Sequence, residues 1–341
     1  MAAYSDIGID LGTSNVLVYM KGKGIVLREP AVVAIDRDSR NVLAIGEDAR
    51  RMLGRTPSSI LAIRPLREGV ISDFELTSAM LRHFVAKVLG KRFFARPRAV
   101  VSLPTGVNEV EKRSIISAMF DAGMRRTQLL ARPIAAAIGA GVDMSEAYGT
   151  MLVDVAAGVT DIAVLSLGQV MVSDVSKIGG DRFDDAIIRF LRRKHNLLIG
   201  ERTAEELKIT IGSAVPRTEQ LSMDVTGRNL LTGLPKTIRV TSEEITEALD
   251  EPLQAFIESV HAVLERTPAE LAADIFEAGI LFTGGGSELM GLCEAVSTAL
   301  KVPCAAAEDP QTCVVMGCGR ALEQPQSLRQ FLDSGRRRFG R

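Results

Sequence analysis

Tryptophan is absent from this chain of 341 residues, and aromatic residues make up only 4% of it. Its hydrophobic cores must therefore be filled by Val, Ile, Leu and Ala, which are among the residues most often buried. Cysteine is scarce as well, and the four cysteines fall in the last fifth of the chain, without a C-x-x-C pair. This spacing argues against a zinc site and predicts reduced core residues. They are Cys293, Cys304, Cys313 and Cys318.

An excess of charge of one sign is also missing. The formal net charge is −1, which argues against electrostatic attraction to nucleic acid, so no nucleic-acid partner is predicted. The first residues lack the basic and apolar stretches of a signal peptide. The longest run of low polarity, residues 133–142, is far shorter than the ~20 apolar residues that cross a bilayer. These absences predict a cytoplasmic protein.

Two common nucleotide motifs are missing too. The chain has no Walker A sequence, and no complete G-x-G-x-x-G, because the glycines at 284–286 are followed by Leu289 where the last glycine belongs. P-loop NTPases and Rossmann dehydrogenases are therefore poor interpretations of this sequence.

A strand–turn–strand pattern is present instead, and it occurs twice. Each copy ends an apolar strand on an aspartate, Asp10 or Asp154, turns through small and hydroxyl-bearing residues, and leaves along a second strand. A later strand, Ile280–Thr283, runs into Gly284-Gly285-Gly286-Ser287. Backbone amides in such turns approach phosphates closely, and carboxylates hold a hydrated metal ion. Two hairpins and a glycine-rich turn together predict a nucleotide site, whereas either aspartate alone is also explained by an Asx-turn.

The remaining elements alternate between strands and helices. Near-continuous apolar strands and amphipathic helices predict an α/β fold with sheets covered by helices. We expect helices at residues 75–89, 108–122, 133–140 and 183–195, the second of them capped by Asn108. A helix is also expected directly after the glycine-rich turn. The repeated hairpin predicts two related halves with a cleft between them.

With these motifs assembled, the chain resembles the bacterial actin-like MreB/Mbl family. The matching segments keep the family's order as far as about residue 320. They are Asp10-Leu-Gly-Thr-Ser-Asn15 and residues 22–26, 62–65, 69–74, 133–139, 200–208, 233–235 and 283–287.

The resemblance implies an actin-like fold, that of actin, Hsp70 and the sugar kinases, with four subdomains. Large subdomain IA is expected to contain residues 1–32, 65–147 and 311–341, and small subdomain IB residues 33–64. Large subdomain IIA is expected to contain residues 148–181 and 245–310, and small subdomain IIB residues 182–244.

The resemblance also implies ATP or ADP with magnesium in the cleft. Asp10 and Asp154 are the implied metal residues, acting through water. The implied nucleotide-binding residues are Gly12, Thr13, Asn15, Gly158, Thr160, Gly179, Gly180, Asp181, Glu205, Lys208, Gly284, Gly285, Gly286 and Ser287. Glu205 and Lys208 are alternatively a surface ion pair at helical spacing, and the glycine-rich turn alternatively serves close packing.

The chain departs from the family at two places. Ala131 and Arg132 stand where the family has two glutamates, the second of which is expected to orient the attacking water. An arginine cannot accept a proton, so it cannot replace that glutamate. Ala156-Ala157-Gly158 replaces three glycines, and the added methyl groups narrow the approach to phosphate and strain any position with positive φ. No intact catalytic residue remains, and at most a slow ATPase is predicted.

A basic segment at residues 87–98 contains Phe93 and Phe94. In the family, a short loop at this place dips into the inner leaflet of the cytoplasmic membrane. Basic residues attract anionic lipid and inserted rings bury apolar area. The alternative is that both rings pack inward where the next strand begins.

The resemblance therefore implies an ATP-binding, membrane-associated cytoskeletal protein that forms homopolymeric filaments and organises wall-synthesis proteins and cell shape. A non-polymerising regulator or capping subunit is an open alternative. A sugar or acetate kinase is the competing enzyme class, but it needs a substrate carboxylate and larger insertions than residues 33–64 and 182–244 provide.

Overall fold

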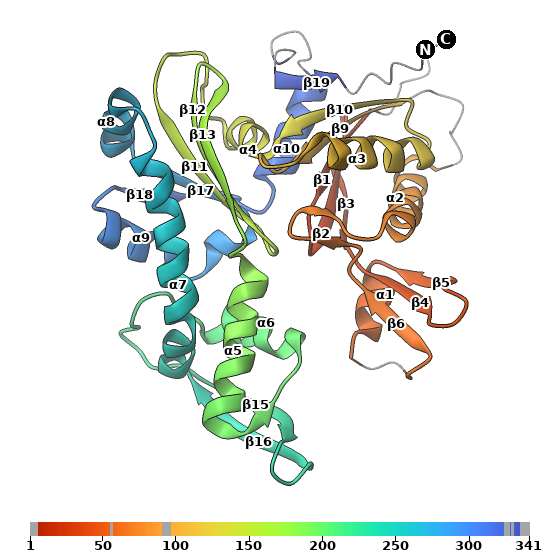
Figure 1. The fold of residues 1–341 in the computed structure, drawn as a ribbon, viewed down its shortest axis with the longest axis vertical. Coiled ribbons are helices and arrows are strands. Elements are labelled where there is room, and N and C mark those ends of the chain that lie inside the picture. Colours follow the sequence, from red (N-terminus) through yellow and green to blue (C-terminus); the bar gives the residue numbers. More distant parts are fainter. Residues whose placement is uncertain (1–5, 55–56, 91–96, 324–327, 329–330, 335–341) are drawn as a thin grey trace. The chain divides into compact units, whose positions relative to one another are not determined.

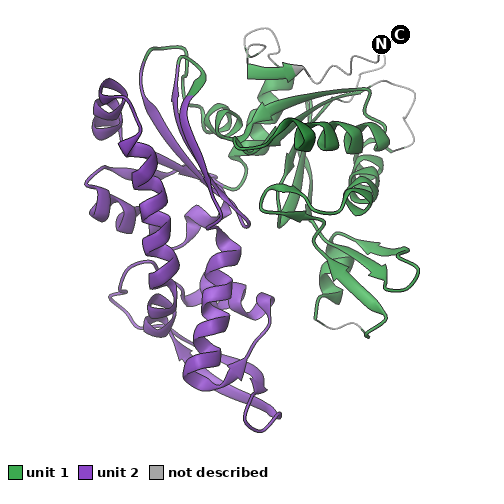
Figure 2. Ribbon diagram, viewed as in Figure 1, with its two compact units in different colours: residues 1–147, 167–170, 311–341 green, residues 148–166, 171–310 purple. Residues whose placement is uncertain are grey.

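The computed structural model describes residues 6–54, 57–90, 97–323, 328 and 331–334. The chain divides into two compact units, shown in different colours in Figure 2. Unit 1 contains residues 1–147, 167–170 and 311–341, and unit 2 contains residues 148–166 and 171–310. The four-subdomain division remains a prediction.

The main sheet of unit 1 has six strands (Figure 1). β1 runs parallel to β9 and β9 parallel to β10, whereas β1, β2 and β3 form an antiparallel meander. All five residues of β1 are buried, as expected of a strand covered on both faces. In spatial order the strands are β19 (Leu332–Ser334), β10 (Arg126–Ala131), β9 (Arg98–Leu103), β1 (Ile7–Leu11), β2 (Asn15–Met20) and β3 (Gly24–Pro30).

The main sheet of unit 2 repeats this arrangement. A meander of three strands is followed by two parallel strands, so β11, β17 and β18 correspond to β1, β9 and β10. The expected repetition of two related halves is therefore confirmed. In spatial order the strands are β13 (Gln169–Ser176), β12 (Thr160–Ser166), β11 (Thr150–Val155), β17 (Ile280–Thr283) and β18 (Cys304–Ala306).

The helices cover these sheets and form separate cores. In unit 1, Ile7 and Ile9 of β1 join the core beneath α2 and α3, while Gly8 faces α10. Because side chains alternate along a strand, Asp10 lies on the α10 face. The helices of unit 1 are α2 (Phe74–Leu89), α3 (Glu109–Asp121), α4 (Arg132–Ala140) and α10 (Cys313–Glu323). Those of unit 2 are α5 (Gly180–His195), α6 (Glu201–Ile211), α7 (Ser242–Glu265), α8 (Ala269–Ala278) and α9 (Leu292–Leu300).

The expected helices are confirmed, with small shifts at their ends. Asn108 caps α3 in a capping box with Glu111, because its side chain accepts two backbone N–H groups while Glu111 accepts the N–H of Asn108. α5 begins at Gly180, one turn before the expected Phe183. The prediction of a helix directly after the glycine-rich turn is wrong: the turn itself forms a short 3-10 helix, η1 (Gly285–Glu288), and α9 begins only at Leu292.

Each unit also carries smaller sheets. Unit 1 has a three-stranded sheet of β4 (Val33–Asp36), β5 (Val42–Ile45) and β6 (Ile60–Ile63) with α1 (Glu47–Met52), and a two-stranded sheet of β7 (Leu66–Arg67) and β8 (Val70–Ile71). Unit 2 has a three-stranded sheet of β14 (Leu197–Leu198), β15 (Ser222–Asn229) and β16 (Pro235–Thr241).

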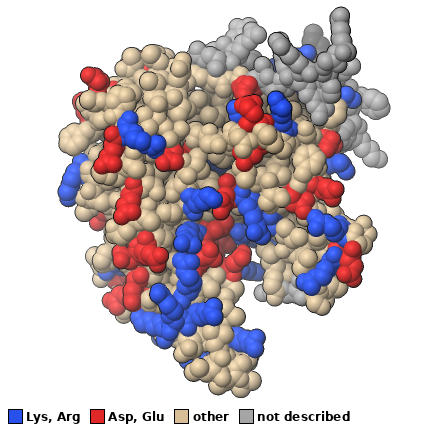
Figure 3. All heavy atoms as spheres, in the orientation of Figure 1, with Lys and Arg blue, Asp and Glu red and all other residues tan. Residues whose placement is uncertain are grey.

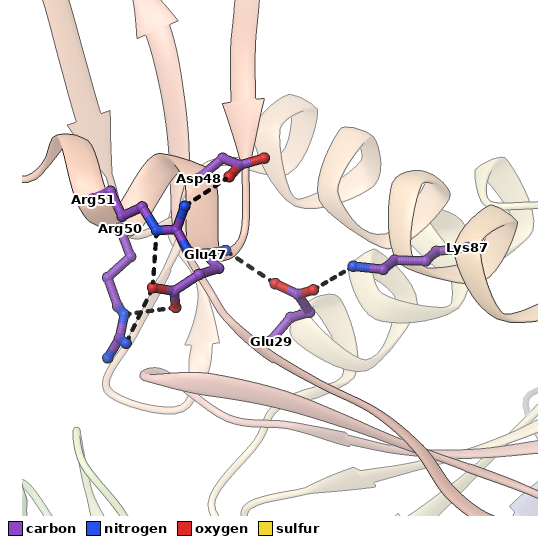
Figure 4. Close-up of polar contacts among 6 residues, drawn as sticks. All are labelled: Glu29, Glu47, Asp48, Arg50, Arg51 and Lys87. Atoms are coloured by element: carbon purple, nitrogen blue, oxygen red, sulfur yellow. Dashed lines mark hydrogen bonds and ion pairs between the residues drawn. The ribbon is translucent and has the colours of Figure 1, made fainter.

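Glu29 links the main sheet of unit 1 to α1 and α2 (Figure 4). Its carboxylate accepts the backbone N–H of Glu47 at 3.0 Å, at the start of α1, and binds Lys87 Nζ of α2 at 2.5 Å. Burial alone would raise the pKa of Glu29, but Lys87 and the N–H of Glu47 together lower it below its ordinary value. One carboxylate from β3 therefore holds α1 and α2 together.

Two glycines allow α4 and α10 to pack at close range. A Cβ on Gly139 would overlap the carbonyl oxygen of Cys313, and a Cβ on Gly317 would overlap the carbonyl oxygen of Ala135. Backbone therefore meets backbone in both directions. This contact fixes where α4 begins, and α4 begins with Arg132.

Basic side chains gather on the face of unit 2 drawn in Figure 3, over the region where Figure 1 places α5. The last turn of α5 contains Arg192, Arg193 and Lys194, which complement the helix dipole. Lys194 Nζ binds Glu247 at 3.0 Å. This cluster thus has a structural explanation in the helix end and an adjacent carboxylate.

No helix among the described residues combines the length and the apolar character needed to span a membrane.

Candidate functional site

The β1–β2 turn is tight and needs its glycine. The N–H of Gly12 donates to the carbonyl of Asn15 at 3.1 Å, and a Cβ on Gly12 would lie only 2.7 Å from the same oxygen. Thr13 Oγ1 is buried and accepts the N–H of Gly69 at 3.3 Å. The Asn15 amide lies 3.5 Å from Ser14 Oγ. The sequence-predicted residues thus form one compact turn, which is braced by the β7–β8 hairpin.

Asp10 lies at the carboxyl end of β1 and is hydrogen-bonded to a residue of the neighbouring strand. Ser102 Oγ of β9 donates to Asp10 Oδ1 at 3.0 Å, and both residues are buried. Ligands of α/β proteins bind outside the carboxyl ends of parallel strands. Ser102 is a functional residue that the sequence did not reveal. Its only signal was a hydroxyl near the end of an apolar strand, and that signal occurs in many proteins without a site.

Unit 2 repeats this contact. Thr283 Oγ1 at the end of β17 donates to Asp154 Oδ1 of β11 at 2.8 Å, and these two residues are paired in the sheet register. Asp154 is 1% exposed. Each unit therefore holds an aspartate and a hydroxyl side by side at the ends of two parallel strands.

Arg132 adds a charge to the Asp10 site. Its Nη2 lies 2.6 Å from Asp10 Oδ1, and the side chains of Arg132 and Asp10 are only 6% and 8% exposed. The sequence analysis singled out Arg132 for what it cannot do in hydrolysis. The structure shows that it forms a buried ion pair with the aspartate of the first hairpin.

This arrangement does not suit magnesium held by Asp10. Mg²⁺ prefers oxygen ligands and keeps its waters, whereas Asp10 Oδ1 receives a guanidinium and a hydroxyl. Among the described residues, no group of three or more His, Cys, Asp and Glu side chains could hold a metal ion. The proposed role of Asp10 in binding magnesium stays a prediction, and the ion pair is an argument against it.

The β11–β12 turn packs on the start of α5. The N–H groups of Gly180 and Asp181 donate to the carbonyls of Ala156 and Ala157 at 3.0 and 2.9 Å. A Cβ on Gly179 would lie 2.5 Å from the Ala157 oxygen, so this approach requires a glycine.

The residues that replace the family's glycines in the β11–β12 turn show no strained backbone. Ala156, Ala157 and Gly158 all lie within the described residues, and none has a positive φ. The expectation that the two alanines strain positive-φ positions is therefore wrong. Thr160 is also buried, and its hydroxyl donates to the carbonyl of Ile178 at 2.6 Å. The turn thus accommodates the alanines without a positive φ at any of these positions.

The glycine-rich turn packs against the same hairpin. A Cβ on Gly284 would lie 2.5 Å from the Val155 carbonyl and 3.0 Å from Asp154 Oδ1, and one on Gly286 would lie 2.5 Å from Val155 Cγ1. Gly285 opens η1, and Ser287 Oγ donates to the Gly284 carbonyl at 2.7 Å. Close packing, the alternative considered for this turn, therefore explains at least two of its three glycines.

Lys208 has a partner that the sequence did not suggest. Its Nζ lies 2.8 Å from Asp184 Oδ1 of α5 and donates to the Gly180 carbonyl at 3.0 Å. Burial raises the pKa of Asp184 to about 6, with further upward contributions from Glu205 and Asp181, although Lys208 acts in the opposite direction. Lys208 thus joins α6 to the start of α5.

Phe93 and Phe94, the predicted membrane-contacting residues, lie outside the described residues.

A sequence model of the MreB/Mbl protein family matches residues 4–330. The chain belongs to the MreB/Mbl family. This MreB/Mbl chain is 50% identical to the cell shape-determining protein Mbl of Bacillus cereus (strain ATCC 10987 / NRS 248) over 323 residues, which are 95% of the chain and 97% of that protein. It is 49% identical to the cell shape-determining protein MreB of Escherichia coli (strain K12) over 324 residues, 94% of the chain and 93% of that protein.

Solved structures agree with the family assignment. The fold matches MreB5 of Spiroplasma citri bound to ADP with a TM-score of 0.91 and 32% identity, covering 96% of this MreB/Mbl chain and 99% of that one. MreB5 bound to AMPPNP matches with a TM-score of 0.92 and 32% identity, covering 97% and 99%. A MamK double helical filament matches at a TM-score of 0.78 and 22% identity, covering 93% and 98%. The expected actin-like α/β fold is confirmed.

Proposed function

We propose that this chain binds ATP and ADP through its two hairpins and the turns packed against them. The observation that carries this proposal is the repeated pair of a buried aspartate and a hydroxyl, Asp10 with Ser102 and Asp154 with Thr283. It is further supported by the ADP and AMPPNP bound to MreB5, whose fold the chain shares. Calorimetric titration with ATP and ADP tests it, and absence of binding would overturn it.

For magnesium, Asp154 is the remaining candidate carboxylate. It lies one residue before the end of β11, beside Thr283 and the glycine-rich turn, and it would act on the ion through water. In the bound state the ion would neutralise phosphate charge, while Asp154 would orient its hydration shell.

We further propose that the chain forms homopolymeric filaments that organise wall-synthesis proteins and cell shape. The relatives at about 50% identity are named cell shape-determining proteins, and their alignments cover nearly the whole chain. Electron microscopy of the purified protein with ATP is the direct test. Particles that remain single at high concentration, with nucleotide and lipid present, would favour the non-polymerising regulator.

The proposed location is cytoplasmic, at the inner leaflet of the membrane. Its support is the basic, Phe-containing segment of residues 87–98. Phe93→Ala with Phe94→Ala should lower sedimentation with anionic liposomes while nucleotide affinity is retained. If both rings belong instead to the core, the double variant loses about 3–5 kcal/mol of stability per ring, which unfolding curves reveal.

Hydrolysis is proposed to be slow. Arg132 is held by Asp10 at 2.6 Å, and a guanidinium has no lone pair with which to accept a proton from water. Phosphate release measured under assembly conditions tests this proposal.

A further inference from the structure

We propose that Arg132 takes the place of a metal ion at the Asp10 carboxylate, so that nucleotide binding by this chain does not depend on Mg²⁺ at the first hairpin. The inference rests on the proposed binding of ATP and ADP. It concerns which cation neutralises the first of the two aspartates.

Three adjacent parallel strands bring the participating residues into one row. Ile9 of β1 is paired with Val101 of β9, and Leu103 of β9 is paired with Ala131 of β10. Arg132 follows Ala131 directly and is the first residue of α4. Its side chain therefore reaches across the end of β9 to Asp10, where Ser102 donates to the same carboxylate oxygen.

The position of Arg132 is fixed by packing. Its side chain is 6% exposed, and α4 is held against α10 by the backbone contacts of Gly139 and Gly317. Arg320 of α10 also donates to the carbonyl of Ile138 in α4. The guanidinium thus lies at the carboxylate before any ligand binds, and it is charged at every physiological pH.

The electrostatic consequence follows from charge balance. A buried carboxylate needs a cationic or hydrogen-bonding partner. Arg132 supplies that partner, so Asp10 and Arg132 together carry no net charge that would attract a divalent ion. A metal ion placed beside Asp10 would also be repelled by the guanidinium. A polyphosphate is not repelled, because guanidinium groups pair with carboxylate and phosphate alike.

The test compares ATP affinity in excess Mg²⁺ with ATP affinity in excess EDTA, measured by calorimetry on the full chain. Because Asp154 is proposed to hold the ion through water, the ratio of the two dissociation constants in the wild-type protein is the reference, and Asp10→Asn should keep that ratio within about threefold. A ratio that falls toward one in Asp10→Asn would show that Asp10 holds the ion, which would overturn the inference and leave the proposed function intact. Absence of binding in both buffers would overturn the proposed function, and the inference with it.

Variants separate the guanidinium from the rest of the site. Arg132→Glu should raise the ratio of the dissociation constant in EDTA to that in Mg²⁺ at least about tenfold above the wild-type ratio, because the cation has been replaced by a second carboxylate. Arg132→Lys keeps the charge and should keep the wild-type ratio. Asp10→Asn should change affinity by the same factor in both buffers, whereas a metal-binding Asp10 would change it in Mg²⁺ alone.

Arg126→Glu is the matched control, because it makes the same charge reversal at the exposed, opposite end of β10. It should leave the ratio of the two dissociation constants unchanged. If Arg132→Glu fails to fold, the comparison of Arg132→Lys and Asp10→Asn still decides. A lysine variant that depends more on Mg²⁺ than the wild-type protein does, or an asparagine variant affected only in Mg²⁺, would contradict the inference.

Discussion

Asp184 of α5 and Lys208 of α6 form an ion pair with 2.8 Å between Oδ1 and Nζ, and their side chains are 12% and 14% exposed. The pKa of Asp184 is nevertheless raised to about 6, because burial outweighs the lysine. A carboxylate that titrates close to neutral pH makes the stability of unit 2 depend on pH in a definite direction.

The first prediction concerns that direction. Between about pH 4 and pH 6 the folded chain keeps a proton on Asp184 that the unfolded chain has lost, so stability falls by about 3 kcal/mol as pH rises through this window. Lys208→Met raises the pKa of Asp184 further, and the decline then continues above pH 6. Urea unfolding at pH 5, 6, 7 and 8 should show a gap between wild type and variant that widens above pH 6. A stability difference between wild type and variant that does not change with pH would contradict the raised pKa of Asp184. Lys236→Met, at an exposed strand position, is the control.

The second prediction concerns the contact of α4 with α10. Gly317→Ala places a methyl group on the Ala135 carbonyl, which is backbone and cannot rotate away. We expect a loss of about 3 kcal/mol or more, together with weaker ATP binding, because the start of α4 carries Arg132. Gly200→Ala, where no atom lies within 4 Å of the added Cβ, should stay within about 0.5 kcal/mol of wild type. Equal losses of stability in Gly317→Ala and Gly200→Ala, measured by thermal unfolding, would contradict this prediction.

The third prediction concerns Glu29. Its pKa lies below the ordinary value of 4.5, so its contribution to stability is present above pH 4.5 and is lost as pH falls through the folded-state pKa. Glu29→Gln should cost about 1 kcal/mol at pH 7, a modest value because Lys87 is half exposed. The cost should shrink below pH 4.5. Glu75→Gln at an exposed position of α2 should show neither effect, and a pH-independent cost in Glu29→Gln would argue against the ion pair.

The fourth prediction concerns hydrolysis. Arg132→Glu alone should weaken ATP binding and release little phosphate, because it loses a cation and places a second carboxylate beside Asp10. Adding Ala156→Gly and Ala157→Gly removes two methyl groups from the second hairpin. The gain in phosphate release by the triple variant should exceed the sum of the gains from the separate changes, as expected if both hairpins act on one nucleotide. Full hydrolysis by the single Arg132→Glu variant would show that the second hairpin was never impaired.

Local elements were predictable because their signals lie within a few residues of one another. Asn108 caps α3 as the sequence predicted, and Glu111, three positions later, completes a capping box. The two aspartates lie one residue before the ends of β1 and β11, close to where the sequence placed them, since an apolar run followed by small residues specifies a hairpin without distant help. The helix expected directly after Gly284–Ser287 is absent, since α9 begins only at Leu292, and the contact of Gly284 and Gly286 with Val155, far away in sequence, was not predictable either.

The sequence by itself determined the repeated hairpins, the α/β class and the family, because each depends on short-range patterns or on motif order. Only the tertiary structure decided which charged groups form ion pairs. Asp10 and Arg132 are 122 positions apart, and the ion-pair partner of Lys208 is Asp184, a residue outside every motif. Strand register and helix packing set these contacts, and neither is encoded in local spacing. For that reason the sequence showed that Arg132 cannot act as a base, and the fold showed that it neutralises Asp10.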